Sequence, residues 1–231
     1  MAEIKVMASA AFKEAYLELA PQFERAAGHK VVTIWAPSAQ LVSRLKAGET
    51  VDLVILSAAA IDDLGTLGIV APGGRFDLAK SGVAVAVRAG AARPDISSGE
   101  ALKRTVLAAR SIVYSKGPSG VYLSGLFERM GIAGQLKPKV QVVQGEPTGA
   151  VVARGEAEIA FQQMSELLPV PGIDIIGPLP DDVQEITVFS AGLHARAGAP
   201  DAAKALVRFL TNPAAAPVIR AKGMEPAGER A

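Results

Sequence analysis

Four short serine-containing segments could bind an anion, because each follows a strand-like stretch and opens a helix-like one. They are residues 8–11, 36–39, 56–59 and 115–120. The first turn of a helix leaves backbone N–H groups unpaired and carries the positive end of the helix dipole. A serine hydroxyl adds a donor, and neighbouring Gly and Ala residues let a ligand approach the backbone closely. These segments therefore predict an anion site built from neutral groups.

The same serines could instead be simple helix caps, because serine is a preferred N-cap residue. In a parallel sheet, however, all strand-to-helix junctions lie at the carboxyl edge of the strands, where open α/β sheets bind ligands. Four such junctions in one chain favour a shared site over four unrelated caps.

Acid–base chemistry would need an ionisable group near these junctions. Lys116 and Glu146 are the ionisable groups nearest the predicted site, and Glu166 follows a strand that ends in the amides of Gln162 and Gln163. These residues are candidates for a catalytic base if the protein is an enzyme. Lys116 and Glu146 could equally be solvated charges at the rim, and the sequence does not choose among the three.

Metal and cofactor chemistry is not indicated. His29 and His194 are the two histidines, and they show no metal-ligand spacing. The chain has no cysteine, so thiolate catalysis and disulfides are excluded. It also lacks dinucleotide-binding, P-loop, nucleophile-elbow and zinc-protease motifs. We expect neither a cofactor nor a metal.

Composition narrows the class of protein further. The chain has 231 residues, of which 50% are hydrophobic and 20% charged, and its formal net charge is +1. The apolar fraction excludes a disordered chain, and the low net charge argues against general nucleic-acid binding. No apolar run is long enough to predict a membrane-spanning helix.

Short apolar segments alternate with helical periods along the chain. Strands are predicted at residues 4–7, 31–34, 52–56 and 82–88, among others. Helices are predicted at residues 12–27, 40–47, 61–67 and 121–130, with Pro21 expected to kink the first or to start a second helix there. This alternation predicts an α/β fold with mixed, mainly parallel sheets. Its units are too numerous for one minimal sheet, so we expect two lobes: residues 1–80 with 188–231, and residues 81–187.

The spaced set of motifs resembles a known family. The motifs are Ala8-Ser9-Ala10, Pro37-Ser38-Ala39, residues 51–58, residues 152–158 and residues 209–213. In order and spacing they resemble the molybdate-binding proteins of ABC transporters, in the type II periplasmic binding-protein superfamily. The resemblance implies two α/β lobes with a ligand cleft between them. It also implies a tetrahedral oxyanion held by serine hydroxyls and backbone N–H groups.

The resemblance carries the family's binding positions onto this chain. Two binding serines match Ser9 and Ser38, a third loop matches Ser57 and Ala58, and the position usually held by a tyrosine falls near Gln162. The full set of ligand-binding residues implied is Ser9, Ala10, Ser38, Ser57, Ala58, Ser119, Gly120, Thr148 and Gln162.

The chain also departs from the family pattern. The second loop begins Trp35-Ala36-Pro37 and is bulkier than the Gly/Ser-rich loop of molybdate binders, the tyrosine is missing, and Lys116 lies beside the site. These changes suggest a different anion, such as an organic carboxylate. Aconitate isomerase has this fold yet catalyses an allylic proton shift on a tricarboxylate.

Two functions therefore remain open. The favoured one is a solute-binding protein that captures a molybdate- or tungstate-type oxyanion, or a small organic carboxylate, for ABC-type transport. The alternative is an isomerase of an unsaturated polycarboxylate, with Glu146, Glu166 or Lys116 as its base. The expected partners are a small anion and, for transport, an ABC permease, and we expect a monomer that neither binds nucleic acid nor inserts into membranes. No signal peptide precedes residue 4, so we expect a periplasmic protein if one was removed and a cytoplasmic protein otherwise.

Overall fold

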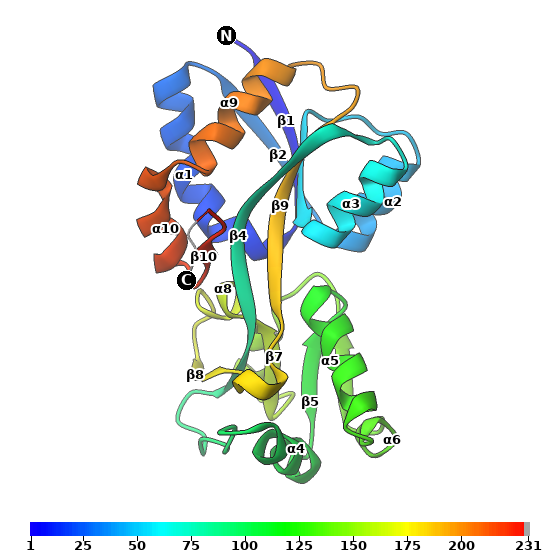
Figure 1. Ribbon diagram of the computed structural model, residues 1–231. Helices are drawn as coiled ribbons and strands as arrows, with labels where there is room; N and C mark the ends of the chain where they lie inside the picture. Colours follow the sequence, from blue (N-terminus) through cyan, green and yellow to red (C-terminus); the bar gives the residue numbers. More distant parts are fainter. Residues whose placement is uncertain (229–231) are drawn as a thin grey trace. The chain divides into compact units, whose positions relative to one another are not determined.

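The computed structural model describes residues 1–228, and the chain forms two compact α/β units (Figure 1). Unit 1 comprises Met1–Ser81 and the chain from Thr187 onward, and unit 2 comprises Gly82–Ile186. The chain passes between the units inside strand β4 (Val70–Arg88) and at the start of strand β9 (Ile186–His194). The predicted α/β class, with mixed and largely parallel strand pairing, is confirmed.

Unit 1 is built on the strand order β2-β1-β3-β9-β4. Strand β1 pairs in parallel with both β2 and β3, whereas β9 runs antiparallel to β3. The elements, in addition to β9 and the first part of β4, are β1 (Glu3–Ala8), η1 (Ala10–Phe12), α1 (Lys13–Ala27), β2 (Lys30–Trp35), α2 (Ser38–Lys46), β3 (Leu53–Ser57), α3 (Ala58–Thr66), α9 (Pro200–Leu210), η3 (Pro213–Ala215), α10 (Ala216–Ala221) and β10 (Glu225–Pro226).

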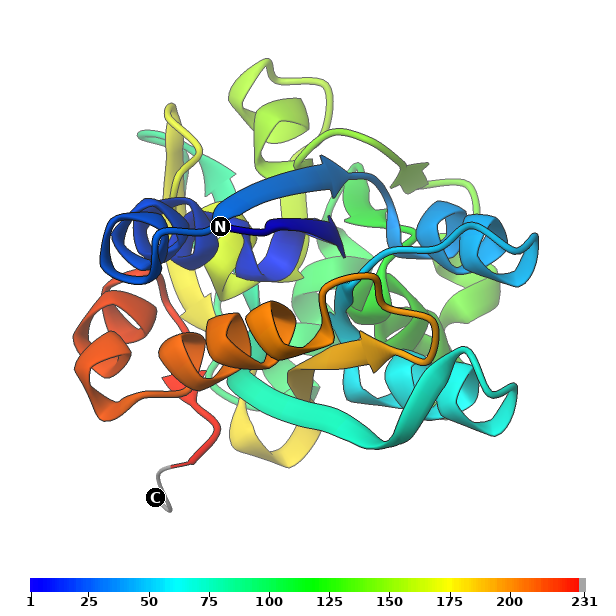
Figure 2. The ribbon, with the colours of Figure 1, turned by 90° about the horizontal axis from the view of Figure 1, so that it is seen from above.

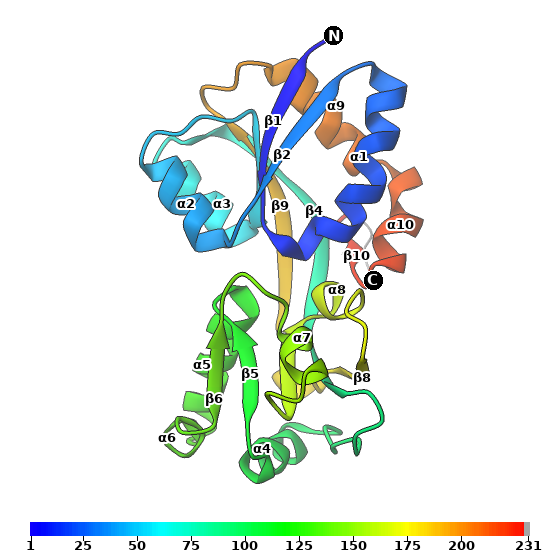
Figure 3. The same cartoon turned by 180° about the vertical axis from the view of Figure 1, so that it is seen from behind.

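Helices cover both faces of the unit 1 sheet, so its central strands are apolar on both sides. On β3, Leu53 and Ile55 belong to the apolar cluster beneath α1, α9 and α10. The alternate residues Val54 and Leu56 belong to the cluster beneath α2 and α3. Figures 1 and 3 show these two helix groups on opposite faces, and Figure 2 shows α9 and α10 beside α1.

Unit 2 repeats this plan with the strand order β4-β7-β5-β6. Strand β5 pairs in parallel with β6 and β7, and β4 runs antiparallel to β7 and β8. The elements are α4 (Gly99–Ala108), β5 (Ile112–Ser115), α5 (Pro118–Arg129), α6 (Ala133–Leu136), β6 (Val140–Val143), α7 (Thr148–Ala153), β7 (Ile159–Gln163), α8 (Met164–Leu167), β8 (Ile173–Pro178) and η2 (Asp181–Val183).

The unit 2 sheet is also buried on both faces. Val83 and Val85 of β4 pack in the cluster formed with α4, α5 and α6. Their neighbours Ala84 and Ala86 pack in the cluster formed with α7 and α8. Alternation along one strand thus divides the side chains between two cores, as the pleat requires.

Three helices begin earlier than the sequence predicts. Helix α2 begins at Ser38 rather than residue 40, α3 begins at Ala58 rather than 61, and α5 begins at Pro118 rather than 121. The apolar periodicity used for the prediction starts only where a helix meets the core. The added first turns bring the serines closer to the helix N-termini.

Two other expectations on secondary structure differ from the structure. Pro21 lies inside the single helix α1, so the alternative that it starts a second helix is wrong. Pro21 and Leu17 lie on the exposed face, so water can hydrate the Leu17 carbonyl that Pro21 leaves without an N–H partner. Strand β4 begins at Val70 and not at residue 82, because residues before 82 pair within unit 1.

Helix α5 is fixed against the end of β5 by Gly120. A Cβ atom on Gly120 would lie 1.6 Å from the Ser115 carbonyl oxygen and 3.0 Å from Tyr114 Cδ2. Only glycine allows this approach, which sets the position of the first turn of α5 relative to the carboxyl end of β5.

We expect Gly120→Ala to lower the free energy of unfolding by about 3 kcal/mol, because the new methyl group must displace a backbone oxygen. The matched control is Gly134→Ala in α6, where a Cβ would meet nothing within 4 Å. That variant should be as stable as the wild type or more stable by up to about 1 kcal/mol. Urea unfolding followed by circular dichroism measures both, and equal midpoints for the two variants would contradict this packing.

Candidate functional site

Three predicted serine segments of unit 1 lie at one edge of its sheet. The parallel register pairs Ala8 of β1 with Trp35 of β2 and with Ile55 of β3. The residues that follow these positions therefore leave the sheet together at its carboxyl edge. Ser9, Ser38 and Ser57 all lie on these departing segments.

Ser9 is held close to the sheet. Its backbone N–H donates to the Ile55 carbonyl at 3.1 Å, and its Oγ lies 3.5 Å from the same oxygen. Only 5% of Ser9 is exposed, whereas Ala10, which begins η1, is exposed. Ser9 is the N-cap of η1 but its side chain makes no capping bond, so its hydroxyl is only weakly engaged.

Ser38 and Ser57 differ in how their hydroxyls are used. Ser57 is the N-cap of α3, and its Oγ accepts from the Ala60 N–H at 3.4 Å. Pro37, not Ser38, is the N-cap of α2, and its carbonyl accepts from Gln40 and Leu41. Ser38 is therefore the first residue of the helix, and within residues 1–228 its hydroxyl has no hydrogen-bond partner. Ala58, the first residue of α3, is partly exposed beside Ser57.

A cation lies at the same edge, and sequence reasoning missed it. Trp35 packs edge-on against Tyr16 with ring centroids 5.5 Å apart, so it belongs partly to the core. Lys13, the first residue of α1, places its Nζ 5.8 Å from the centroid of the Trp35 ring. In the described part of the chain Lys13 has no carboxylate partner. In the sequence, Lys13 lies four residues after Ser9, and this short spacing is the signal that could have placed a cation near the predicted serine segment.

Unit 2 has an equivalent edge. The register pairs Ser115 of β5 with Val143 of β6, and Tyr114 with Phe161 of β7. Helices α5, α7 and α8 therefore begin at the shared carboxyl edge of these strands. Ser119 is 1% exposed, and its Oγ has no hydrogen-bond partner among the described residues. The Gly120 N–H donates to the Gly117 carbonyl at 3.0 Å, so that donor is already used inside the helix.

Thr148, Gln162 and Glu166 form one hydrogen-bonded group at this edge. The Thr148 N–H and Oγ1 both contact Gln162 Oε1, at 2.8 and 2.9 Å, and Thr148 Oγ1 also lies 3.2 Å from the Phe161 carbonyl. Gln162 Nε2 in turn donates to Glu166 Oε1 at 2.9 Å. The two donors of Thr148 are thus directed at the protein itself.

The Glu166 carboxyl has an unusual pKa. Burial raises the pKa from 4.5 to about 7, and the hydrogen bond from Gln162 opposes this rise. The residue keeps some exposed surface, but the protein around the carboxylate makes its charged form costly. A carboxyl group with a pKa near neutrality can both accept and donate a proton at physiological pH.

The other two candidate bases lie in different surroundings. Glu146 is exposed, and its carboxylate pairs with the Arg154 guanidinium at 3.0 Å. Lys116 is exposed, and its backbone N–H donates to the Val143 carbonyl at 3.1 Å. Glu166 thus lies in a hydrogen-bonded group at the strand ends, whereas Glu146 and Lys116 are exposed.

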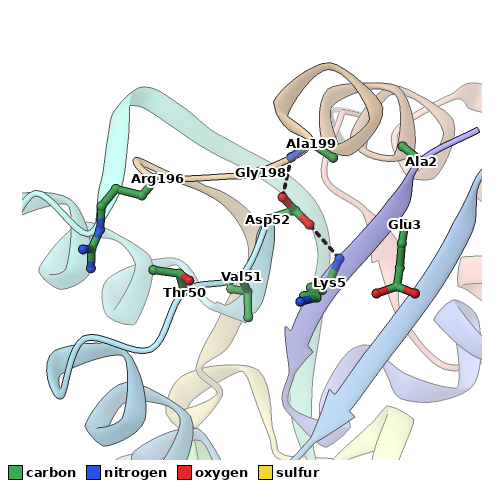
Figure 4. A pocket seen from close by; sticks show the side chains of 9 residues that line it. All are labelled: Ala2, Glu3, Lys5, Thr50, Val51, Asp52, Arg196, Gly198 and Ala199. Carbon is green, nitrogen blue, oxygen red and sulfur yellow. Dashed lines mark hydrogen bonds between the residues drawn. The ribbon is translucent and has the colours of Figure 1, made fainter.

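A cavity of about 410 Å³ lies at the opposite edge of the unit 1 sheet, near the amino ends of β1 and β3 (Figure 4). Its lining includes Lys5, Asp52 and Arg196. The buried Asp52 carboxylate accepts from the backbone N–H groups of Lys5 and Ala199, at 2.8 and 2.7 Å. Asp52 thereby ties the segment before α9 to β1, which is a structural role.

Within residues 1–228, no group of three or more His, Cys, Asp or Glu side chains is placed to hold a metal ion. No helix in this part of the chain combines the length and apolarity needed to cross a bilayer.

Residues 4–225 match the family described as bacterial extracellular solute-binding proteins, and the chain belongs to this family. The relationship to molybdate-binding proteins and to aconitate isomerase, inferred above from motifs, is confirmed. An aconitate isomerase from Pseudomonas sp. is 42% identical over 96% of this chain and 87% of its own length.

A molybdate-binding protein from Azotobacter vinelandii is 28% identical over 96% of this chain and 89% of its own. The solved structure of the Azotobacter vinelandii periplasmic molybdate-binding protein has a TM-score of 0.74 and 20% identity, and covers 96% of this chain and 98% of that one. This structural likeness confirms the fold of the type II periplasmic binding proteins.

The raised pKa of Glu166 predicts a pH-dependent stability. The folded protein binds the Glu166 proton more tightly than the unfolded chain does. The contribution of this proton to the free energy of unfolding is therefore full below pH 4.5 and is lost as the pH rises through about 7. Glu166→Gln should therefore unfold with a free energy higher than the wild type by up to roughly 3 kcal/mol at pH 8, and by much less at pH 4.5.

Urea unfolding at the two pH values measures this difference. The control is Glu158→Gln, which removes an exposed carboxylate of the same unit that pairs with Arg110. Equal pH dependence in the wild type and Glu166→Gln would show that Glu166 titrates as an ordinary carboxyl.

Proposed function

We propose that this protein binds an unsaturated polycarboxylate of the aconitate type and moves its double bond by an allylic proton shift. The Glu166 carboxyl carries the proposal, because it has a pKa of about 7 and lies at the carboxyl edge of the unit 2 strands. The 42% identity to an aconitate isomerase supports it. This choice reverses the preference that the sequence alone favoured.

The reaction needs one base and no redox partner. Aconitate has a methylene group that lies beside both a carboxylate and the alkene. Glu166 removes one methylene proton, and the electron pair of that C–H bond forms the new double bond. The alkene carbon that is not part of the new double bond then takes the proton from Glu166, using the electron pair of the old double bond to form its new C–H bond. Atoms and charge balance, and the carboxylate is regenerated.

Neutral donors would hold the substrate carboxylates while negative charge moves across the carbon skeleton. In this proposal the anion-binding groups are the neutral donors at each carboxyl edge, which are Ser9, Ser38 and Ser57 on unit 1 and Ser119 on unit 2. The free hydroxyl of Ser38 and the buried, unpartnered hydroxyl of Ser119 support such a role. Lys13 would add a positive charge, which a triply charged substrate favours more than an oxyanion does.

Proton NMR in D2O tests the isomerase activity directly. Wild-type protein should interconvert cis- and trans-aconitate, and Glu166→Gln should lower the rate at least about 100-fold, since a general base contributes that much or more. Glu158→Gln and Glu146→Gln should stay within a few fold of the wild type. Unchanged spectra with wild-type protein would remove this function, and loss of activity in Glu146→Gln alone would assign the base to Glu146.

A second candidate function is capture of an oxyanion for ABC-type transport, with a permease as partner. The neutral donors at the unit 1 edge and the 28% identity to a molybdate-binding protein favour it. On this view the hydrogen bonds alone provide affinity, and Glu166 has no chemical role. The family is one of extracellular solute-binding proteins, and an extracellular location suits a transport receptor.

Calorimetry with molybdate, tungstate, sulfate and citrate separates the two functions. If oxyanion capture is correct, molybdate or tungstate should bind at micromolar or lower concentration, and Ser38→Ala should weaken binding at least about tenfold. Ser124→Ala, on the exposed face of α5, is the control. Heat with citrate but with none of the three inorganic ions would contradict oxyanion capture.

A further inference from the structure

The side-chain amide of Gln162 has one defined orientation. The Thr148 backbone N–H can only donate, and it lies 2.8 Å from one end of the amide, which must therefore be the carbonyl oxygen. Thr148 Oγ1 lies 2.9 Å from the same atom. The amide nitrogen is consequently the end that meets Glu166 Oε1, at 2.9 Å.

This orientation makes the two oxygens of Glu166 chemically different. Oε1 faces an N–H donor and is kept as a hydrogen-bond acceptor, so a proton on Glu166 belongs on Oε2. Thr148 and Gln162 are 0% and 4% exposed, which protects the arrangement from competing water. A buried hydrogen-bond network of this kind restricts both the rotamer and the protonation site of the carboxyl.

We propose that Gln162 is a positioning residue, which with Thr148 fixes Oε2 of Glu166 as the single oxygen that takes up and returns the substrate proton. The inference rests on the proposed function and deepens it. The C–H bond of the methylene breaks as the Oε2–H bond forms, and Oε2–H then breaks as the new C–H bond forms at the far carbon. One oxygen performs both transfers, so both occur on the same face of the substrate.

The first test needs no catalytic activity. Protein labelled with ¹³C at the glutamate carboxyl carbons is titrated by NMR, and the Glu166 signal is assigned by its loss in Glu166→Gln. Because the Gln162 hydrogen bond stabilises the carboxylate, Gln162→Met should raise the pKa of Glu166 by about one unit. Thr148→Val should raise it less, since its backbone N–H remains.

The control is Gln141→Met, which removes a side-chain amide that donates to the Glu156 carbonyl at 2.8 Å in the same unit. Its Glu166 signal should titrate as in the wild type. An unchanged Glu166 pKa in folded Gln162→Met would overturn the inference, and if that variant does not fold, Thr148→Val decides by the same measurement.

The second test follows the pH dependence of aconitate isomerisation. Gln162→Met should lower kcat about tenfold or more and leave KM within a few fold of the wild-type value. In the pH profile of kcat, the limb that reflects ionisation of the base should shift to higher pH. A Gln162→Met profile equal to that of the wild type would refute the positioning role while the isomerase function stands. A wild-type protein without activity would refute the function, and the NMR titration would still decide the role of Gln162.

Discussion

Parallel pairing of the central strands determines where this protein can do chemistry. In unit 1 it brings the ends of β1, β2 and β3 to one edge, and in unit 2 it does the same for β5, β6 and β7. Helix N-termini and short polar side chains follow each of these ends. If one of these strands ran antiparallel, the segment that follows it would leave the sheet at the opposite edge. In unit 1 that is the edge where Asp52 and Lys5 serve structural roles.

The sequence was sufficient for the fold class and for most elements, because apolar periodicity records which residues are buried. It placed the starts of α2, α3 and α5 too late, since their first turns lie outside the core and carry no such periodicity. Serine patterns located the candidate segments, but the direction of each hydroxyl depends on tertiary contacts. Thr148, expected to face a ligand, directs both donors at Gln162, and no local pattern specifies that choice.

Binding and catalysis would use the same fold with a small change in chemistry. Neutral hydroxyl and N–H donors suffice to hold an anion, and they are present at both sheet edges. What a binding protein does not require is a carboxyl group whose burial raises its pKa to about 7, at the edge where the anion donors lie. Glu166 is therefore the residue that separates this chain's proposed chemistry from that of a simple receptor.

The division of unit 1 into two sequence segments affects the order in which the molecule can fold. Unit 2 is continuous from Gly82 to Ile186, whereas the core of unit 1 includes Phe189 and Leu206, which are synthesised after all of unit 2. Since domains generally fold as units during synthesis, unit 2 can be complete on the ribosome while unit 1 still lacks β9 and α9. Until β9 has been synthesised, one edge of β3 in the N-terminal segment therefore remains unpaired.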